Sequence, residues 1–544
     1  MSDNNELQNN KEEILDFISR KPWIFLGVLT IIGLSIRLYF FPNDLPPTGD
    51  AIGYFWYAND MSILGQFPEL SYKENFSPPP NNGWPAFLSI FFAGLNSTDF
   101  LEYVELQRII TVIISTFTIF PVYFLAKKFV AIPFAIISSS FFIFDPRLIE
   151  NSLLGITESA FLFLGVSSIA LFLSKKRIFI ITSFAVAGLF TLVRYEGLLI
   201  LVPMIIIFFM RYYKNKREYL TFSLCIFIFL LVIFPMALIR IDTTGNDGIV
   251  SHFSAGPIYY ATTAEESANT LENIYVNFLI KGIFFMSKYF GLLLIPMFII
   301  FLPIGIFEIF RKRNYKKWTL VIFGLVFLIP AFYAYSRGFE DTRYLFFLIP
   351  IFSIFAGYTI SRISNKIKKP KMVFYGSLTG LIVMSFISTS VIIFDFQEEK
   401  ELYHIVRDID ELTGTINRDF EGVSYIKWTS ELIEDQFPIT QIELHEKNPT
   451  SGKIVIIGKL SMNEFDTLKE YLEFGKKENL THLVLNGKNM NTEFLQDIFF
   501  NEKEYVFLKK IYDSKEIGYE LHVKIFEIDY DKMNIFFENK LITR

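Results

Sequence analysis

Two acidic residues stand out in this 544-residue sequence because of the apolar stretches beside them. Glu158 lies inside an apolar stretch, in the run Ile-Thr-Glu-Ser-Ala, and Asp50 follows the end of the first apolar stretch. A charged group is costly in lipid, so an acid at such a place needs a partner, a polar cavity or a chemical task. The alternatives stay open: Asp50 as a solvated loop acid or helix cap, and Glu158 as half of a buried pair that only fixes helix packing.

Further charged residues gather at the predicted turns between apolar stretches. These are Asp145, Arg147 and Glu150, then Arg194 and Glu196, then Arg337, Glu340, Asp341 and Arg343. A guanidinium binds phosphate through two hydrogen bonds and keeps its charge, so Arg194 and Arg343 are candidate ligands of an anionic group. The alternative is an ion pair within the protein, Arg194 with Glu196 or Arg343 with Asp341. Arg37, near the outer end of the first stretch, is expected to extend its charge toward water.

Composition indicates a membrane protein. Hydrophobic residues make up 52% of the chain and phenylalanine alone occurs 63 times, more apolar surface than a soluble core buries. The net charge of −5 gives no basis for nucleic-acid binding, and the single cysteine, Cys225, excludes a disulfide framework. The first apolar stretch lacks a cleavage pattern and is expected to remain as a signal anchor.

The apolar stretches predict about eleven transmembrane helices, and the charges between them predict their orientation. The stretches are 22–42, 107–127, 129–144, 151–173, 178–193, 197–210, 219–240, 283–307, 318–336, 344–361 and 372–394. Alternate connections are rich in Lys and Arg, which places them in the cytoplasm, whereas the long loop 43–105 contains only Lys73 against several acids. We therefore predict a multi-pass cell-membrane protein with a cytoplasmic tail at 1–21, a membrane domain at 22–395, an external loop at 43–105 and an external domain at 396–544.

The pattern changes after Phe394 to that of a small soluble α/β domain. Helical periodicity covers Glu398–Leu412 and Met462–Lys477. Short β-rich runs lie at Val423–Trp428, Lys453–Gly458, His482–Asn486, Tyr505–Ile511 and Tyr519–Ile528. The alternation of strands and helices predicts a partly parallel sheet.

The order of these motifs resembles the GT-C superfamily of membrane glycosyltransferases over residues 20–395. The motifs are Gly-Asp50 with Tyr54 in a long first external loop, Thr157-Glu158, Arg194-Tyr195-Glu196-Gly197 and Asp341-Thr342-Arg343-Tyr344. The most similar branch comprises the dolichyl-phosphate-mannose protein mannosyltransferases and the RgtA/B/C/D-like and aminoarabinose transferases of lipid A. The expected fold is therefore a polytopic α-helical, GT-C-like membrane domain with an external α/β domain.

The resemblance implies an inverting transfer of a sugar from a polyprenyl (dolichyl) phosphate to a protein, glycan or lipid acceptor outside the membrane. It implies that Asp50 is the general base, with Asp60 as the alternative, and that Arg194 and Arg343 bind the donor phosphate. Glu158 would orient the sugar or acceptor, or hold an arginine. The supporting residues would be Tyr54, Asp60, Asp145, Glu196, Asp341 and Tyr344.

Two departures from related patterns bear on this reading. Ala51 follows Asp50, where many protein O-mannosyltransferases carry adjacent acids, and the Trp-Trp-Asp signature of the metal-dependent oligosaccharyltransferases is missing from the sequence. The first departure argues against a protein acceptor, and the second leads us to expect no cofactor and no catalytic metal. An oligosaccharyltransferase-like or glycan-polymerising enzyme using a lipid-linked oligosaccharide, a lipid-glycan transporter or flippase, and a membrane receptor remain alternatives. The sequence contains no inverted repeat of the transporter type.

Overall fold

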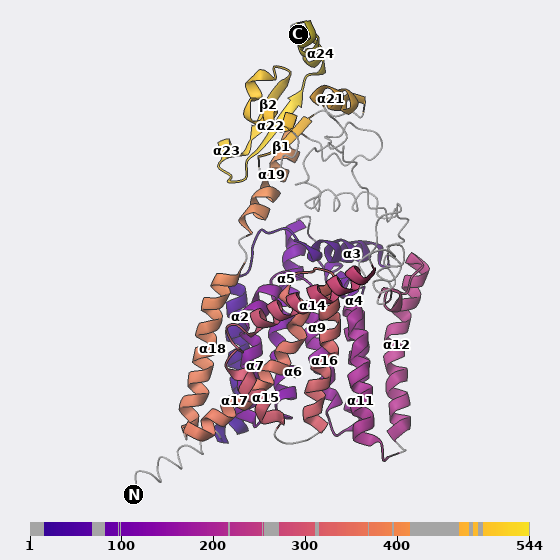
Figure 1. Cartoon of the computed structure of the whole chain (residues 1–544), viewed down its shortest axis with the longest axis vertical. Coiled ribbons are helices and arrows are strands. Elements are labelled where there is room, and N and C mark those ends of the chain that lie inside the picture. Colours follow the sequence, from indigo (N-terminus) through magenta and orange to yellow (C-terminus); the bar gives the residue numbers. More distant parts are fainter. Residues whose placement is uncertain are drawn as a thin grey trace.

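A computed structural model describes most of the chain as a helical bundle followed by a small C-terminal sheet (Figure 1). The described residues are 16–67, 82–95, 97, 100–215, 218–252, 254, 271–310, 315–367, 369–393, 396–413, 467–477, 482–487 and 493–542. The predicted strands Val423–Trp428 and Lys453–Gly458 lie outside them.

Most helices in the first half of the bundle overlap the predicted apolar stretches. Its helices are α2 (Pro22–Tyr39), α3 (Asp50–Leu64), α4 (Gly83–Phe92), α5 (Phe100–Phe117), α6 (Ile119–Ala126), α7 (Ile132–Ile143), α8 (Pro146–Ser152), α9 (Glu158–Phe172) and α10 (Arg177–Val193). A bend of 54° separates α7 from α8. At this bend the Asp145 carboxylate caps α8 by accepting hydrogen bonds from the backbone amides of Arg147 and Leu148.

The second half continues to the last membrane helix. It contains η1 (Tyr195–Ile200), α11 (Leu201–Tyr212), α12 (Glu218–Thr244), α14 (Leu271–Leu294), α15 (Phe301–Phe310), α16 (Tyr315–Ser336), η2 (Thr342–Leu348), α17 (Ile349–Ile367) and α18 (Pro370–Ile392). The single helix predicted at 283–307 is wrong, because α14 ends at Leu294 and α15 begins at Phe301. Pro296 and Pro303 lie in this region, and proline disfavours an uninterrupted helix by removing a backbone donor.

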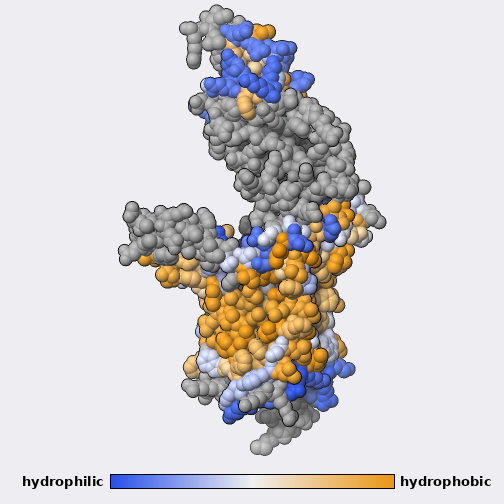
Figure 2. Space-filling view, turned by 90° about the vertical axis from the view of Figure 1, so that its right-hand side faces the viewer, coloured by the Kyte–Doolittle hydropathy of each residue, from blue (hydrophilic) through white to orange (hydrophobic). Residues whose placement is uncertain are grey.

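The bundle has the surface of a multi-pass membrane protein. Among the described residues, eight helices are long and apolar enough to cross a membrane, or nine if α7 and α8 form one bent span, while α9 and α10 are shorter apolar helices. On the face drawn in Figure 2, an apolar belt crosses the middle of the bundle between more polar ends. The number eleven and the side on which each terminus lies remain predictions.

The interior of the bundle is largely apolar, but it contains an arginine whose charge was predicted to reach water. Arg37 is buried and donates hydrogen bonds to the carbonyls of Gly33 and Ile143 and to the Ser115 hydroxyl, at 3.0–3.1 Å. The expectation that Arg37 extends toward water is therefore wrong. Two backbone carbonyls and a hydroxyl therefore solvate its charge inside the protein.

The C-terminal sheet has three described strands, β1 (His482–Asn486), β2 (Leu508–Asp513) and β3 (Val523–Ile528), in the order β1-β3-β2. Both neighbouring pairs are antiparallel, so the prediction of a partly parallel sheet is wrong for these strands. Helices α21 (Leu468–Lys477), α22 (Glu493–Phe500), α23 (Ser514–Ile517) and α24 (Tyr530–Ile542) complete this region, with short η5 (Glu502–Glu504). The residues between Asp513 and Val523 form α23 and a turn, which lets β3 return alongside β2.

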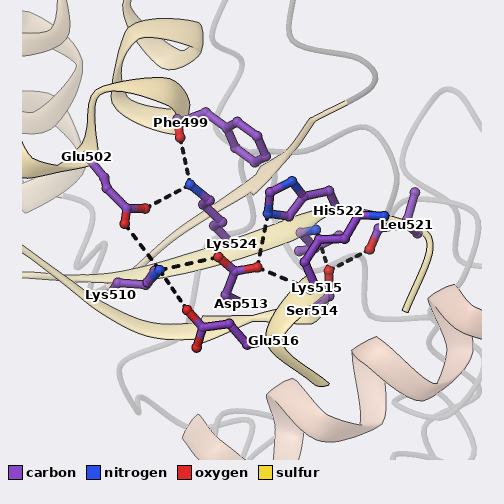
Figure 3. A network of polar contacts seen from close by, with 11 residues as sticks. Phe499, Glu502, Lys510, Asp513, Ser514, Lys515, Glu516, Leu521, His522 and Lys524 are labelled. Carbon is purple, nitrogen blue, oxygen red and sulfur yellow. Dashed lines mark hydrogen bonds and ion pairs between the residues drawn. The ribbon is translucent and has the colours of Figure 1, made fainter. Parts of the chain in front are cut away.

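Polar contacts hold the β2–β3 edge together, as Figure 3 shows. Lys510 forms ion pairs with Glu502, Asp513 and Glu516 at 3.1–3.3 Å, and Lys524 pairs with Glu502 at 2.8 Å. The network therefore joins η5 to both strands and is satisfied within the domain.

Helix α19 (Gln397–Thr413) connects the last membrane helix to this sheet. Its Leu402 and Ile405 pack with Val523 and Ile525 of β3. The Glu401 carboxylate accepts a hydrogen bond from the backbone amide of Leu521 at 2.7 Å. These contacts join α19 to the C-terminal sheet.

Candidate active site

Asp50 is the first residue of α3, a helix that lies across the end of the bundle facing the C-terminal sheet (Figure 1). Gly49 precedes it with φ of 54°, a backbone conformation that favours glycine. Helix α3 has a buried face that packs with α4 in an aromatic cluster containing Phe55, Trp56 and Trp84. This packing fixes the helix whose first turn presents the Asp50 carboxylate.

Arg343 meets Asp50 although 293 residues separate them in sequence. Arg343 Nη1 lies 2.5 Å from Asp50 Oδ2, and its Nε lies 3.1 Å from Asp341 Oδ2. Asp341 also caps η2 by accepting a hydrogen bond from the Arg343 backbone amide at 2.9 Å. The Asp50 side chain is 53% exposed and that of Arg343 is 22% exposed, so this pair is open to water.

A second acid–arginine cluster is much more deeply buried. Arg194 bonds through Nη1 to Glu158 and through Nη2 to Glu196 Oε1 at 3.1 Å. Its guanidinium also lies 5.6 Å from the centre of the Phe161 ring. The exposed fractions of the Glu158 and Arg194 side chains are 3% and 17%. Two carboxylates therefore flank the Arg194 guanidinium, which also lies against an aromatic ring.

The position predicted for Glu158 is wrong in one respect. It does not lie inside the helix predicted at 151–173, because residues 153–157 form a turn and α9 begins at Glu158. Gly155 in this turn has φ of 76°, which a glycine adopts without strain. A carboxylate in the first helical turn is stabilised by the helix dipole, and here it faces Arg194 as well.

The two acid–arginine clusters form one site. Glu158 and Asp50 both interact electrostatically with Arg343, and Tyr54 interacts with Arg194. Tyr344 also belongs to this site, because the centre of its ring lies 5.5 Å from the Arg343 guanidinium. The structure thus brings together eight of the ten residues predicted for the site: Asp50, Tyr54, Glu158, Arg194, Glu196, Asp341, Arg343 and Tyr344.

The other two predicted residues have different surroundings. Asp145 is fully buried and caps α8, as described above. Asp60 is buried on α3, where it interacts electrostatically with Tyr57. Burial raises the pKa of Tyr57 to about 12, with nearby Arg240 opposing and Asp60 adding to this effect. Asp60 is ten residues further along α3 than Asp50, away from the turn that faces Arg343.

Four further polar residues lie near the site and were not predicted from the sequence. Gln107 and Arg108 on α5 are 1% exposed and bond to the chain around Asp50 and Glu158. Arg240 on α12 donates to the Asn82 side chain, and His252 contacts the Tyr195 ring at 4.5 Å. Arg108 and Arg240 lie near the ends of apolar stretches. An ionisable group at such a place needs a partner, so their positions in the sequence could have identified them.

The described residues do not fit a divalent metal. They contain no group of three or more His, Cys, Asp and Glu side chains arranged to hold one. The site carboxylates Asp50 and Glu158 are instead paired with guanidinium groups. Oxygen-ligated divalent cations need several carboxylate or carbonyl ligands at once.

Solved structures of two membrane proteins share this architecture. The oligosaccharyltransferase of Archaeoglobus fulgidus tethered with an acceptor peptide matches with a TM-score of 0.57 at 14% identity, over 87% of this chain and 70% of that one. ArnT from Cupriavidus metallidurans bound to undecaprenyl phosphate matches with a TM-score of 0.53 at 10% identity, over 93% of this chain and 98% of that one.

The protein has the GT-C fold. The fold expected from the motifs is therefore confirmed. Sequence identities of 14% and 10% establish the fold alone. The A. fulgidus protein also has a structure with dolichol-phosphate, matching at a TM-score of 0.54, and another with Zn and sulfate. No protein-family model matches the chain, and no curated protein matches it.

Proposed function

We propose that this protein is an inverting glycosyltransferase that moves a sugar from a polyprenyl phosphate to an acceptor at the external face of the membrane. The observation that carries the proposal is the Asp50–Arg343 pair, an accessible carboxylate beside an accessible guanidinium at one end of a membrane bundle. The reaction needs these two groups together, a proton acceptor for the nucleophile and a cation for the leaving phosphate.

In the proposed reaction the acceptor hydroxyl or amine attacks the anomeric carbon of the donor. A bond forms between the acceptor atom and that carbon, while the bond from carbon to phosphate oxygen breaks and leaves its electron pair on the phosphate. Asp50 takes the proton of the acceptor. Its carboxylate is half exposed, so an acceptor arriving from water can reach it.

Arg343 is the guanidinium best placed to bind the donor phosphate. It is partly exposed and touches Asp50, so a phosphate bound to it would lie next to the base. Arg194 is more deeply buried, and its guanidinium already pairs with Glu158 and Glu196. We propose that its positive charge stabilises the negative charge that develops on the leaving phosphate. Glu158 then acts mainly by holding Arg194.

Chemistry like this, with guanidinium groups at the phosphate, does not require a metal, and we propose that none is essential. The GT-C neighbours with undecaprenyl phosphate or dolichol-phosphate support a polyprenyl-phosphate donor here. The predicted orientation, with the basic loops in the cytoplasm, supports an external site.

The test is donor turnover by the purified full-length protein. It is incubated with radiolabelled polyprenyl-phosphate hexoses, with and without EDTA, and release of label from the lipid is measured. Asp50→Asn is expected to abolish turnover. Asp44→Asn is the matched control: Asp44 is an exposed acid of the same loop with φ of 55°, which asparagine tolerates. Full activity of Asp50→Asn would exclude Asp50 as the base and direct attention to Asp60 and Glu158.

A second candidate is transfer of an oligosaccharide from a lipid-linked donor. It is supported by the match to the A. fulgidus oligosaccharyltransferase, of which this chain covers 70%. Turnover that EDTA abolishes, or that occurs only with lipid-linked oligosaccharides, would favour this candidate over the first.

A further inference from the structure

The turns that carry Asp50 and Glu158, called the catalytic turns below, both lack a side-chain helix cap. Asp50 and Glu158 each begin a helix, and the residues before them, Gly49 and Thr157, make no side-chain capping bond. Gly49 and Gly155 have positive φ in these turns. Glycine turns of this kind are conformationally permissive, so side chains from elsewhere must fix them.

Helix α5 supplies a side chain that bonds to both turns. Gln107 Nε2 donates to the carbonyl of Gly155 at 2.7 Å and, at 3.5 Å, to the carbonyl of Ala51, the residue after Asp50. The side chain is 1% exposed, so no water competes for these carbonyls. One amide group therefore spans the two segments that carry the site acids.

The next residue of α5 holds the chain that leads into Asp50. Arg108 Nη1 donates to the Leu45 carbonyl at 2.5 Å and Nη2 to the Pro46 carbonyl at 2.6 Å. Arg108 is also 1% exposed. Its planar guanidinium fixes two consecutive carbonyls at once, which a single-point donor cannot do.

These two side chains are costly choices for stability alone. Gln107 Oε1 is buried without a hydrogen-bond partner, and so is Arg108 Nε. Well-packed apolar side chains of similar volume would avoid this cost. The fit at Gly155 is also tight, since a Cβ there would lie 3.0 Å from Gln107 Cγ.

We propose that Gln107 and Arg108 are positioning residues that set the distance and orientation between the Asp50 and Glu158 carboxylates. Neither is placed to touch the reacting atoms, and both act through the backbone of the turns. The catalytic consequence rests on the proposed glycosyl transfer. A displacement of the base by about 1 Å lowers the rate of a positioned reaction by roughly 100-fold.

The first measurement compares Gln107→Leu with Thr111→Val. Thr111 is equally buried on the same helix, but its hydroxyl bonds to the Ser152 carbonyl, in neither catalytic turn. We expect Gln107→Leu to lower kcat by roughly 10- to 100-fold with the donor KM changed less than about twofold. Thr111→Val should keep kcat within about twofold of wild type. A rise in donor KM at unchanged kcat would overturn the proposal.

Rescue at Arg108 separates positioning from simple loss of packing. Arg108→Lys retains a donor for one carbonyl, whereas Arg108→Met retains only the apolar stem. The lysine variant should keep several-fold more kcat than the methionine variant at equal folded yield. Equal kcat values for the two variants would contradict a role through the Leu45 and Pro46 carbonyls.

Hydrogen exchange tests the same inference without any donor. In Gln107→Leu the backbone amides of residues 49–53 and 155–159 should exchange faster by roughly tenfold or more, with exchange elsewhere in the bundle unchanged. Unchanged exchange at both turns would refute the positioning role. If wild type turned over no donor while the turns still loosened, the proposed function would fail and the structural inference would stand.

Discussion

The two acid–arginine pairs of the site differ in burial, and this difference predicts different costs for the same chemical change. Glu158→Gln and Asp50→Asn each replace a carboxylate by an amide of the same shape. The Glu158 side chain is 3% exposed and its partner Arg194 is 17% exposed, whereas the Asp50 side chain is 53% exposed. Glu158→Gln removes a buried counter-charge and Asp50→Asn an accessible one.

The expected magnitudes follow from these environments. Breaking a buried ion pair by removing one partner costs about 3–5 kcal/mol, and the lower end applies here because Glu196 still pairs with Arg194. Breaking an exposed pair costs about 0.2–1 kcal/mol. We therefore expect Glu158→Gln to lower the free energy of unfolding by about 3 kcal/mol and Asp50→Asn to lower it by under about 1 kcal/mol.

Thermal unfolding in one detergent, followed by tryptophan fluorescence, measures the difference. Glu158→Gln should lower the apparent unfolding temperature by several degrees, and Asp50→Asn should leave it nearly unchanged. A double-mutant cycle with Arg194→Gln should show strong coupling to Glu158. Equal shifts for the two single variants, or no coupling between Glu158 and Arg194, would refute the assignment of a buried and an accessible pair.

Three further predictions follow from the same contacts. Gly155→Ala should destabilise by about 1–3 kcal/mol because φ is 76°, whereas Gly376→Ala, at an open position of α18, should be neutral or stabilising by up to about 1 kcal/mol. Thermal unfolding of the two alanine variants measures the difference, and equal changes in stability would contradict the prediction. Arg343→Lys keeps the charge but loses the planar fork, so kcat/KM for a polyprenyl-phosphate donor should fall roughly 10- to 100-fold; unchanged kcat/KM would remove Arg343 from phosphate binding. The hydrogen bond from Lys524 lowers the pKa of Glu502, against a smaller opposing effect of burial. The stability from Glu502 is therefore complete above its unfolded-state pKa of about 4.3 and is lost as pH falls through the lower folded-state pKa, so Glu502→Gln should show a smaller acid-induced drop in unfolding temperature than wild type.

The long-range contacts also explain which expectations succeeded. Arg194–Glu196 and Arg343–Asp341 are separated by two residues, and both pairs were foreseen as alternatives to ligand binding. Each arginine has a second carboxylate partner, and these partners join the separate motifs into one site. No local pattern predicts them, because they depend on how α3, α9, η1 and η2 pack.

The sequence by itself determined that the chain is a membrane protein, where most of its apolar helices lie, and which residues carry most of the charges of the site. Lipid imposes these features residue by residue, since every backbone group must be bonded within a helix and every charge is costly. Only the tertiary structure decided that Glu158 begins α9, that Asp50 meets Arg343, that Gln107 bonds to both catalytic turns and that the described C-terminal strands are antiparallel. These features arise from contacts between segments distant in sequence, whose geometry is set by packing and not by the local pattern of residues.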